Sequence, residues 1–100
     1  MVQLGINLIP DMPCEEVIET IQAAEQLGYS VCLLDDEGFM PDVYTLLGRA
    51  AEKTSAIRLG PVTNGYTRHP AVTAVAVATL NEISGGRAVA ALVVFFSSPA

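Results

Sequence analysis

The chain has 100 residues, of which 51% are hydrophobic and only 16% are charged. This composition excludes an intrinsically disordered chain, and the length allows at most one domain with a single modest core. The formal net charge is −6, and the five lysine and arginine residues are scattered along the chain. An acidic chain without a basic patch is a poor partner for nucleic acid or for an anionic membrane surface.

The cysteines and the apolar segments exclude further classes of protein. Cys14 and Cys32 stand alone, so no metal site and no disulfide framework is predicted, and a reducing cytoplasm is expected. No basic segment precedes the first apolar residues, as it would in a signal peptide. The longest apolar run, Ala88–Phe96, is too short to cross a bilayer.

The first strand and the first helix are predicted within the opening 28 residues. Val2–Ile9 is mostly apolar and reads as a strand that Pro10 ends. Asp11 or Met12 is expected to cap the helix that follows. Apolar residues then recur with a helical period, and Gly28 is expected to close the helix in a left-handed conformation.

The second strand and helix repeat this order. Val31–Leu34 is an unalternating apolar run, which is typical of a strand buried on both faces of a parallel sheet. The acidic run Asp35–Glu37 follows at its carboxyl end. A second helix is predicted from Pro41, with Asp42 in its first turn and Lys53 near its negative end.

A third strand, a polar turn and a third helix form the corner where α/β folds place their chemistry. Ile57–Val62 is the strand, and Thr63, Asn64 and Gly65 make the turn. The helix opens at Pro70, where a missing N–H group costs nothing.

Two nucleotide-binding motifs are excluded at this corner. Gly60 and Gly65 have the glycine spacing of a P-loop, but Tyr66 and Thr67 stand where the lysine should follow. The dinucleotide fingerprint G-x-G-x-x-G does not occur in the sequence.

The last third of the chain predicts a helix and a fourth strand. Ala71–Ile83 is apolar on nearly all sides and too long for one strand, so a buried helix is expected. Gly85 and Gly86 end it, and the strand is expected to run over Arg87–Phe96.

The predicted order βαβαβαβ implies a parallel sheet with right-handed crossovers. Strands recur about every 30 residues, close to the repeat of a (β/α)₈ barrel of the TIM type. We therefore expect residues 1–100 to form a single partial domain, a half barrel with strand order 1-2-3-4 and its helices on one face. A small open four-stranded sheet would show the same periodicity.

Three segments closely resemble the bacterial-luciferase-like family of oxidoreductases. They read Val62-Thr63-Asn64, then Tyr-Thr-Arg-His-Pro-Ala-Val-Thr-Ala over 66–74, then Ala-Thr-Leu-Asn-Glu-Ile-Ser-Gly-Gly-Arg-Ala-Val over 78–89. The resemblance implies the N-terminal half of a (β/α)₈ barrel that uses a reduced flavin-type ring, FMN or coenzyme F420, on a small-molecule substrate. The form of the middle segment is most similar to the F420-dependent branch, which includes methylenetetrahydromethanopterin reductases.

The resemblance also implies which residues line a cofactor site. They share the carboxyl ends of the strands, where Asn7 is expected to form one pocket with Asp36 and Thr63; the full set is Asn7, Asp36, Val62, Thr63 and Asn64. In the family a non-prolyl cis peptide supports the ring, and here it would be the Pro61–Val62 bond. The residues alone also allow plain alternatives, namely a solvated acidic loop at Asp36 and a turn in which Asn64 or Gly65 has positive φ.

Neither of the remaining polar residues of the corner identifies a catalytic group, and the catalytic residues stay unknown. His69 is the only histidine, but it immediately precedes a helix-opening proline, so a structural entry to the helix is favoured. Arg68 is expected to form a surface ion pair, with anion binding as the alternative.

Whether this chain is itself an enzyme is left open by the sequence. It lacks the second half of the barrel, so we expect it to be inactive alone and to bind FMN or F420 weakly or not at all. The alternative is a non-catalytic α/β interaction or binding module. In either case the edges of the first and fourth strands would be unpaired, which predicts self-association.

Overall fold

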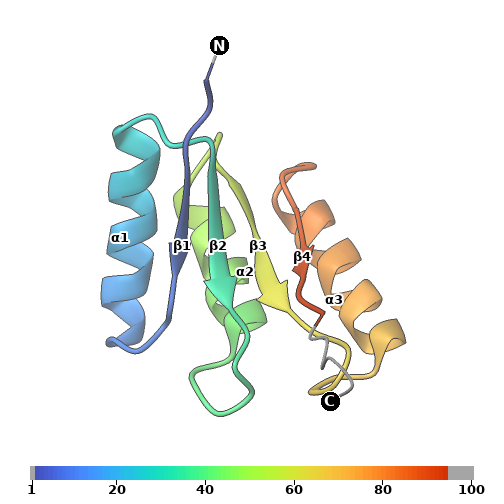
Figure 1. Ribbon diagram of the computed structural model, residues 1–100. Coiled ribbons are helices and arrows are strands. Elements are labelled where there is room, and N and C mark those ends of the chain that lie inside the picture. The colour runs from blue at the N-terminus through green and yellow to red at the C-terminus, as the bar shows by residue number, and fades with distance from the viewer. Residues whose placement is uncertain (1, 95–100) are drawn as a thin grey trace.

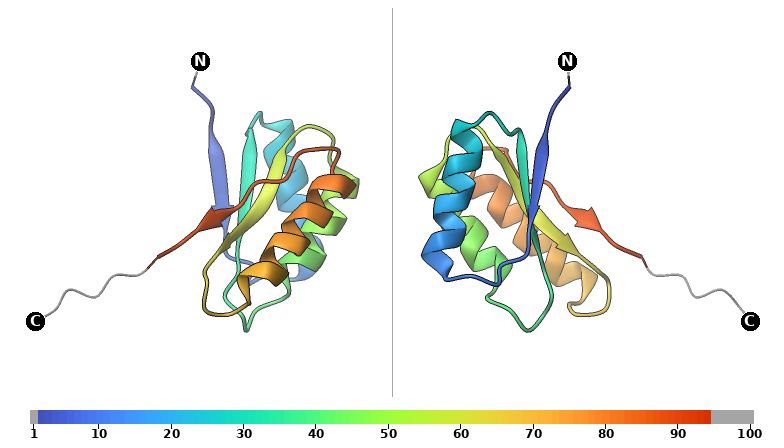
Figure 2. Two further views of the ribbon diagram at one scale, coloured as in Figure 1. Left: turned by 90° about the vertical axis from the view of Figure 1, so that its right-hand side faces the viewer. Right: turned by 60° about the vertical axis from the view of Figure 1, so that its left-hand side comes forward.

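The computed structural model describes residues 2–94, which form a four-stranded parallel sheet and three helices. The elements alternate along the chain as β1 (Gly5–Leu8), α1 (Cys14–Gln26), β2 (Val31–Asp35), α2 (Val43–Lys53), β3 (Arg58–Thr63), α3 (Pro70–Ile83) and β4 (Ala91–Leu92). The strand order is β1-β2-β3-β4, and all the helices cover the same face of the sheet (Figures 1 and 2). Both features confirm the predicted barrel-type topology, because a doubly wound sheet carries helices on both faces.

The core lies between the helix-covered face of the sheet and the first two helices. Side chains along a strand point to opposite faces in turn, and the register puts Ile6, Cys32 and Leu59 in one row on the covered face. These side chains meet the buried stripes of α1 and α2, which are Val17, Ile18, Ile21 and Ala24 on α1 and Val43, Leu46, Leu47, Ala50 and Ala51 on α2.

The opposite face of the sheet is called the open face below, since no helix of residues 2–94 lies over it (Figure 2). The same alternation and register assign eight residues of β1, β2 and β3 to it: Gly5, Asn7, Val31, Leu33, Asp35, Arg58, Gly60 and Val62.

The helix starts differ from those predicted. Neither Asp11 nor Met12 caps α1; its N-cap is Pro13, which makes no side-chain hydrogen bond, and the Pro13 carbonyl accepts from the first-turn amides of Glu16 and Val17. Proline fits this position because its fixed φ suits the entry to a helix. At the other end Gly28 has φ +91°, which confirms the predicted left-handed residue.

The second helix begins at Val43, two residues after the predicted start. Asp42 is its N-cap, and Asp42 Oδ2 accepts a hydrogen bond from the Thr45 amide at 2.9 Å. This bond satisfies one of the amides that a helix start leaves unpaired. The predicted place of Lys53 in the last turn is confirmed.

The prediction that the third helix is buried is wrong. Only Thr73 and Leu80 of α3 are buried, whereas Val72, Val75 and Ile83 are more than half exposed. The helix packs beside α2 (Figure 1), but Ala74 and Ala78 on its sheet-facing side are exposed. A helix with apolar residues on every side is buried only where other elements cover each of those sides.

The fourth strand is much shorter than the predicted range Arg87–Phe96. It spans Ala91–Leu92, with one isolated bridge between Leu59 and Ala88, and the end of the predicted range lies outside the described residues. Arg87 precedes the strand, and its guanidinium caps the end of α2. Its Nη2 donates to the Ala51 carbonyl and its Nη1 to the Ile57 carbonyl, both at 2.9 Å.

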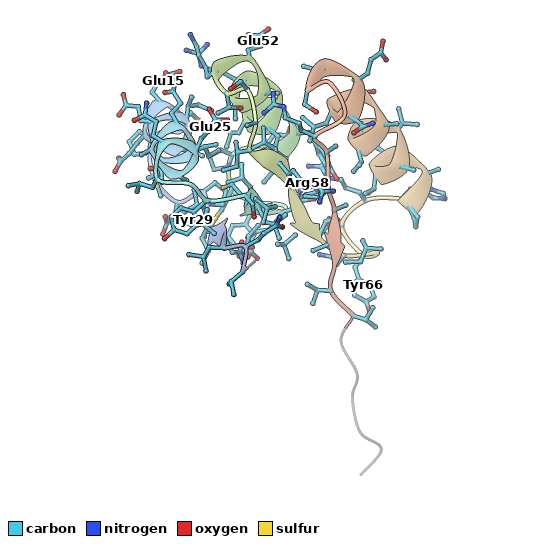
Figure 3. The ribbon with its side chains drawn as sticks, turned by 90° about the horizontal axis from the view of Figure 1, so that it is seen from above. Glu15, Glu25, Tyr29, Glu52, Arg58 and Tyr66 are labelled. Atoms are coloured by element: carbon cyan, nitrogen blue, oxygen red, sulfur yellow. The ribbon has the colours of Figure 1, made fainter. Side chains whose placement is uncertain are left out.

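Glu25 fixes the turn between α2 and β3. One carboxylate oxygen, Oε2, accepts hydrogen bonds from the consecutive amides of Ser55, Ala56 and Ile57 at 2.7–2.9 Å. Figure 3 shows Glu25 on the side of α1 that faces α2. Burial alone would raise the pKa of this carboxyl group, but the three amide donors and the charge of Arg87 outweigh it and lower the pKa below its usual value.

No helix within residues 2–94 has the length and hydropathy needed to span a membrane. Cys14 is exposed and Cys32 is buried, and both thiols are free. Burial raises the pKa of the Cys32 thiol to about 11, which keeps it protonated and unreactive at neutral pH.

Candidate functional site

The carboxyl ends of β2 and β3 bring the two polar loops of the chain together. Because both strands run in the same direction, Asp36 follows β2 beside the end of β3, where its amide donates to the Val62 carbonyl at 2.9 Å. The β2–α2 loop and the β3–α3 turn therefore start side by side. This is the edge of the sheet where a barrel carries its chemistry.

A buried carboxylate, that of Asp36, lies at the centre of this edge. Its side chain is 3% exposed. Asp36 Oδ2 accepts hydrogen bonds from Thr63 Oγ1 and from Arg68 Nε, each at 3.0 Å, and Arg68 Nη2 lies 3.5 Å from Oδ1. Both oxygens thus have partners supplied by the chain itself. The alternative of a solvated acidic loop does not hold for Asp36.

Arg68 links this carboxylate to the start of α2. Its Nη2 donates to Asp42 Oδ1 at 2.7 Å, and its guanidinium carbon lies 4.9 Å from the centre of the Tyr44 ring. Hydrogen bonds to Asp36 and Asp42 raise the pKa of Arg68 still further. We call Asp36, Asp42, Thr63 and Arg68 the strand-end network.

The strand-end network changes the pKa values of Asp42, which belongs to it, and of the neighbouring Tyr44. Partial burial would raise the pKa of Asp42, but hydrogen bonds from Arg68 and Thr45 outweigh it and hold the pKa below its usual value. The pKa of Tyr44 is raised, first by burial and then by the negative charge of Asp36. Asp42 is therefore ionised at neutral pH, and Tyr44 is protonated.

The turn after β3 is organised by Asn64. Its Oδ1 accepts hydrogen bonds from the amides of Tyr66 at 2.7 Å and Thr67 at 2.9 Å, an Asx turn. The alternative in which Asn64 or Gly65 has positive φ is wrong, because only Gly28, Gly38, Gly85 and Gly86 have positive φ among residues 2–94. The Asn64 side chain therefore stabilises the turn, and no residue of the turn adopts a left-handed backbone conformation.

The predicted cis bond at Pro61–Val62 is also wrong, since every peptide bond among residues 2–94 is trans. Pro61 and Val62 continue the regular ladder of β3, where they pair with Leu34 and Asp35 of β2. Val62 pairs with Ala91 of β4 on its other side. The chain therefore passes through this position as ordinary strand.

His69 has the structural role that the sequence favoured. It is the N-cap of α3, and its Nδ1 accepts a hydrogen bond from the Ala71 amide at 3.1 Å. Because its Nδ1 accepts this bond, His69 stabilises the start of α3. Arg68 forms the expected surface ion pair with the exposed Asp42, and it also pairs with the buried Asp36, which the sequence did not predict.

The structure divides the predicted site residues between the two faces of the sheet. Asp36 and Thr63 lie together on the helix-covered side, and Asn64 follows them in the turn. Asn7 and Val62 lie on the open face, where their register partners are Leu33 and Asp35. The single pocket expected for Asn7, Asp36 and Thr63 is therefore not formed.

One polar atom of the open face was not singled out by the sequence. Asp35 Oδ1 is buried and has no hydrogen-bond partner among residues 2–94. Consecutive side chains of an extended chain point to opposite faces of a sheet. This alternation is the sequence signal that could have placed Asp35 and Asp36 on different faces. Within residues 2–94 no three His, Cys, Asp or Glu side chains gather as metal ligands would.

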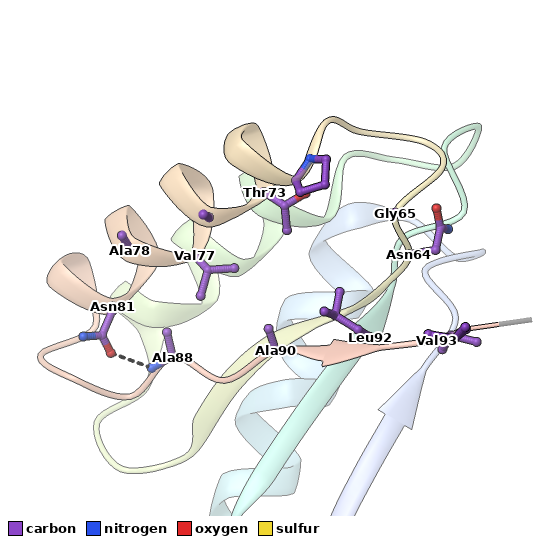
Figure 4. A pocket seen from close by; sticks show the side chains of 13 residues that line it. Asn64, Gly65, Thr73, Val77, Ala78, Asn81, Ala88, Ala90, Leu92 and Val93 are labelled. Atoms are coloured by element: carbon purple, nitrogen blue, oxygen red, sulfur yellow. Dashed lines mark hydrogen bonds between the residues drawn. The ribbon is translucent and has the colours of Figure 1, made fainter.

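A cleft of about 760 Å³ lies between α3 and β4 (Figure 4). Its lining is mostly small and apolar, and at one end Asn81 Oδ1 accepts a hydrogen bond from the Ala88 amide at 3.2 Å. The cleft is the uncovered sheet-facing side of α3. None of the four residues of the strand-end network lines the cleft, although Asn64 and Gly65 of the adjoining turn do.

The fold and the strand-end geometry define a consecutive piece of a parallel βα barrel. The model of the luciferase-like monooxygenase family matches residues 3–97, so the chain belongs to that family. It is 44% identical over 88 residues to 5,10-methylenetetrahydromethanopterin reductase of Archaeoglobus fulgidus, covering 87% of this chain and 26% of the relative. The reductase of Methanopyrus kandleri is 43% identical over 89 residues, with 88% and 26% covered.

A solved structure shows the same arrangement. The coenzyme F420-dependent tetrahydromethanopterin reductase of Methanopyrus kandleri superposes with a TM-score of 0.88 and 41% identity, over 91% of this chain and 26% of that one. The chain thus spans about a quarter of the length of these relatives. Within residues 2–94 this chain carries the four strands β1 to β4.

Proposed function

We propose that this chain supplies the first strands and helices of an F420-dependent oxidoreductase barrel that acts on a tetrahydropterin-type small molecule in the cytoplasm. The observation that carries the proposal is the superposition on the F420-dependent reductase with 41% identity over 91% of the chain. The name of the solved relative favours F420 over FMN, and the names of the sequence relatives favour a methylenetetrahydromethanopterin-like substrate.

The residues present fit one side of a flavin-type ring. On the open face Leu33 and Val62 give apolar surface near the carboxyl ends of neighbouring strands, and the unpartnered Oδ1 of Asp35 marks a polar edge. In our proposal Asn7, Leu33 and Val62 hold the ring, and the strand-end network keeps the two loops in place. When bound, F420 supplies the hydride chemistry; this chain supplies position and electrostatics.

The proposal is tested by titrating the full chain with F420 and, separately, with FMN. We expect weak binding of F420, with a dissociation constant above about 100 μM, since four strands surround a ring only in part. No reductase activity is expected. A low-micromolar constant would show a complete site in the chain, whereas no binding at millimolar F420 would contradict a cofactor-contacting surface.

A second candidate function, an interaction module that pairs with another copy of itself, is favoured by the surface of α3 and β4. Val72, Val75, Leu92 and Val94 are each more than half exposed. From His69 to Val94 the only ionisable groups besides His69 are Glu82 and Arg87, so this surface carries little of the net charge of −6. Two copies that meet here avoid the repulsion of their acidic surfaces.

A further inference from the structure

The neighbouring carboxylates Asp35 and Asp36 differ in what the chain itself offers them. Asp36 on the helix-covered side has Thr63 and Arg68 as partners. Asp35 lies on the open face, and its Oδ1 is buried without a donor from the described part of the chain, residues 2–94. A buried acceptor without a donor opposes folding unless something else satisfies it.

The position of Asp35 limits what such a donor can be. Asp35 pairs with Val62 at the last rung of the β2–β3 ladder, and Leu33 lies one step back on the same face. Leu33 and Val62 are both apolar, so a planar ligand that lies on them would present its edge to the carboxylate. An ionised carboxylate is an acceptor only, so this edge must carry N–H or O–H.

We propose that Asp35 binds the donor edge, N–H or O–H, of a planar heteroaromatic ring that lies on the open face, either a deazaflavin or a pterin. The assignment rests on the proposed function. It makes Asp35 a ligand-contacting residue and Asp36 a positioning residue, whereas the resemblance to the family implied Asp36 as the site-lining residue and gave Asp35 no role. Arg68 and Thr63 act through Asp36 and do not touch the ligand.

The test is an NMR titration of the full chain with two separate probes, F420 and tetrahydromethanopterin, each up to millimolar concentration. We expect one probe or both to shift the signals of Asn7, Leu33, Asp35 and Val62. Asp35→Leu should weaken binding of the responsible probe about tenfold or more, the scale of one hydrogen bond to a charged group. Asp35→Asn, which keeps the shape and one acceptor oxygen, should weaken it less.

Two further measurements separate ligand contact from a structural role. The midpoint of urea unfolding of the ligand-free chain should not fall in Asp35→Leu, because the removed oxygen has no partner to lose. Glu37→Gln removes an exposed carboxylate two residues away and should change binding less than twofold. If Asp35→Leu and the wild-type chain bound the probe equally well, the role of Asp35 would be overturned while the proposed function would stand. No binding of either probe by the wild-type chain would overturn the proposed function, and the assignment with it.

Discussion

Arg68 and Asp36 form an ion pair across 32 positions of sequence, with Nε 3.0 Å from Oδ2, and the carboxylate is almost fully buried. The same guanidinium reaches Asp42, the N-cap of α2. One side chain therefore fixes the β3–α3 turn against both the end of β2 and the start of α2.

Replacing Arg68 by methionine should destabilise the fold by about 2–3 kcal/mol, because it leaves the Asp36 charge buried without its cation. This value lies below the full cost of breaking a buried pair, since Arg68 is itself 29% exposed. Urea unfolding measures the change.

The matched control is Arg49→Met, which breaks the exposed ion pair of Arg49 with Glu15 and should cost less than about 0.5 kcal/mol. Adding Asp36→Asn to Arg68→Met should recover part of the loss, because the uncompensated charge is then gone. Equal losses for Arg68→Met and Arg49→Met would mean that the strand-end network adds nothing to stability.

Acid should destabilise the fold through Glu25. Its folded pKa is lowered from the usual 4.5, so the unfolded state binds the proton more readily. The stability that Glu25 contributes is therefore present above about pH 4.5 and is lost as the pH falls through the folded pKa.

Glu25→Gln should lower the free energy of unfolding at pH 7 by about 1 kcal/mol and flatten its decline as the pH falls below the usual pKa of 4.5. Unfolding curves at several pH values test this. Glu19→Gln removes an exposed carboxylate from the same helix and should leave the pH profile unchanged. If Glu25→Gln kept the wild-type acid slope, the three amide bonds would not be the source of the pH dependence.

The order of the elements could be predicted because it depends on local signals. Apolar runs, helical periods and glycine stops are readable residue by residue, and β1 to α3 follow them to within a few residues. The bonds of Arg68 could not be predicted, since they depend on two loops that meet only in the folded sheet. Likewise the alternation of Asp35 and Asp36 has meaning only once the end of β2 is known.

The exposure of α3 shows a second limit of the sequence. Its composition predicts a helix with neighbours on every side, and the helix is there, but periodicity does not say which surfaces cover it. The expected pocket of Asn7, Asp36 and Thr63 failed for a related reason. All three lie towards the carboxyl ends of strands, yet they project to different faces of the sheet.

Gly60 should tolerate no side chain. A Cβ atom there would lie 1.6 Å from the carbonyl oxygen of Val89, where the chain crosses towards β4. Gly60→Ala should therefore abolish the pairing of β4 with β3 and cost about 2 kcal/mol or more, as overpacking against backbone does.

The control is Gly48→Ala within α2, where a Cβ atom meets nothing within 4 Å. This change should stabilise the chain by about 0.5–1 kcal/mol, the helix preference of alanine over glycine. Urea unfolding gives both values, and amide exchange of Val89 and Val93 reports the β4 pairing. Gly60→Ala with unchanged exchange at these amides would show that the close approach is not kept in solution.

Self-association should depend on the surface that α3 and β4 leave exposed. Val94, two residues after the end of β4, is 62% exposed. An unpaired strand edge without charge pairs readily with another chain, and burying apolar area adds about 25 cal/mol per Å². We therefore expect a dimer or larger species at micromolar concentration, and Val94→Lys should shift it towards monomer by placing a charge on this edge.

The control is Ala23→Lys, which adds the same charge at an exposed position of α1 and should leave the oligomeric state unchanged. Light scattering coupled to size-exclusion chromatography measures the mass of all three proteins. A folded wild-type monomer at high concentration, identical to both variants, would exclude the α3–β4 surface as an interface and favour a self-sufficient small domain.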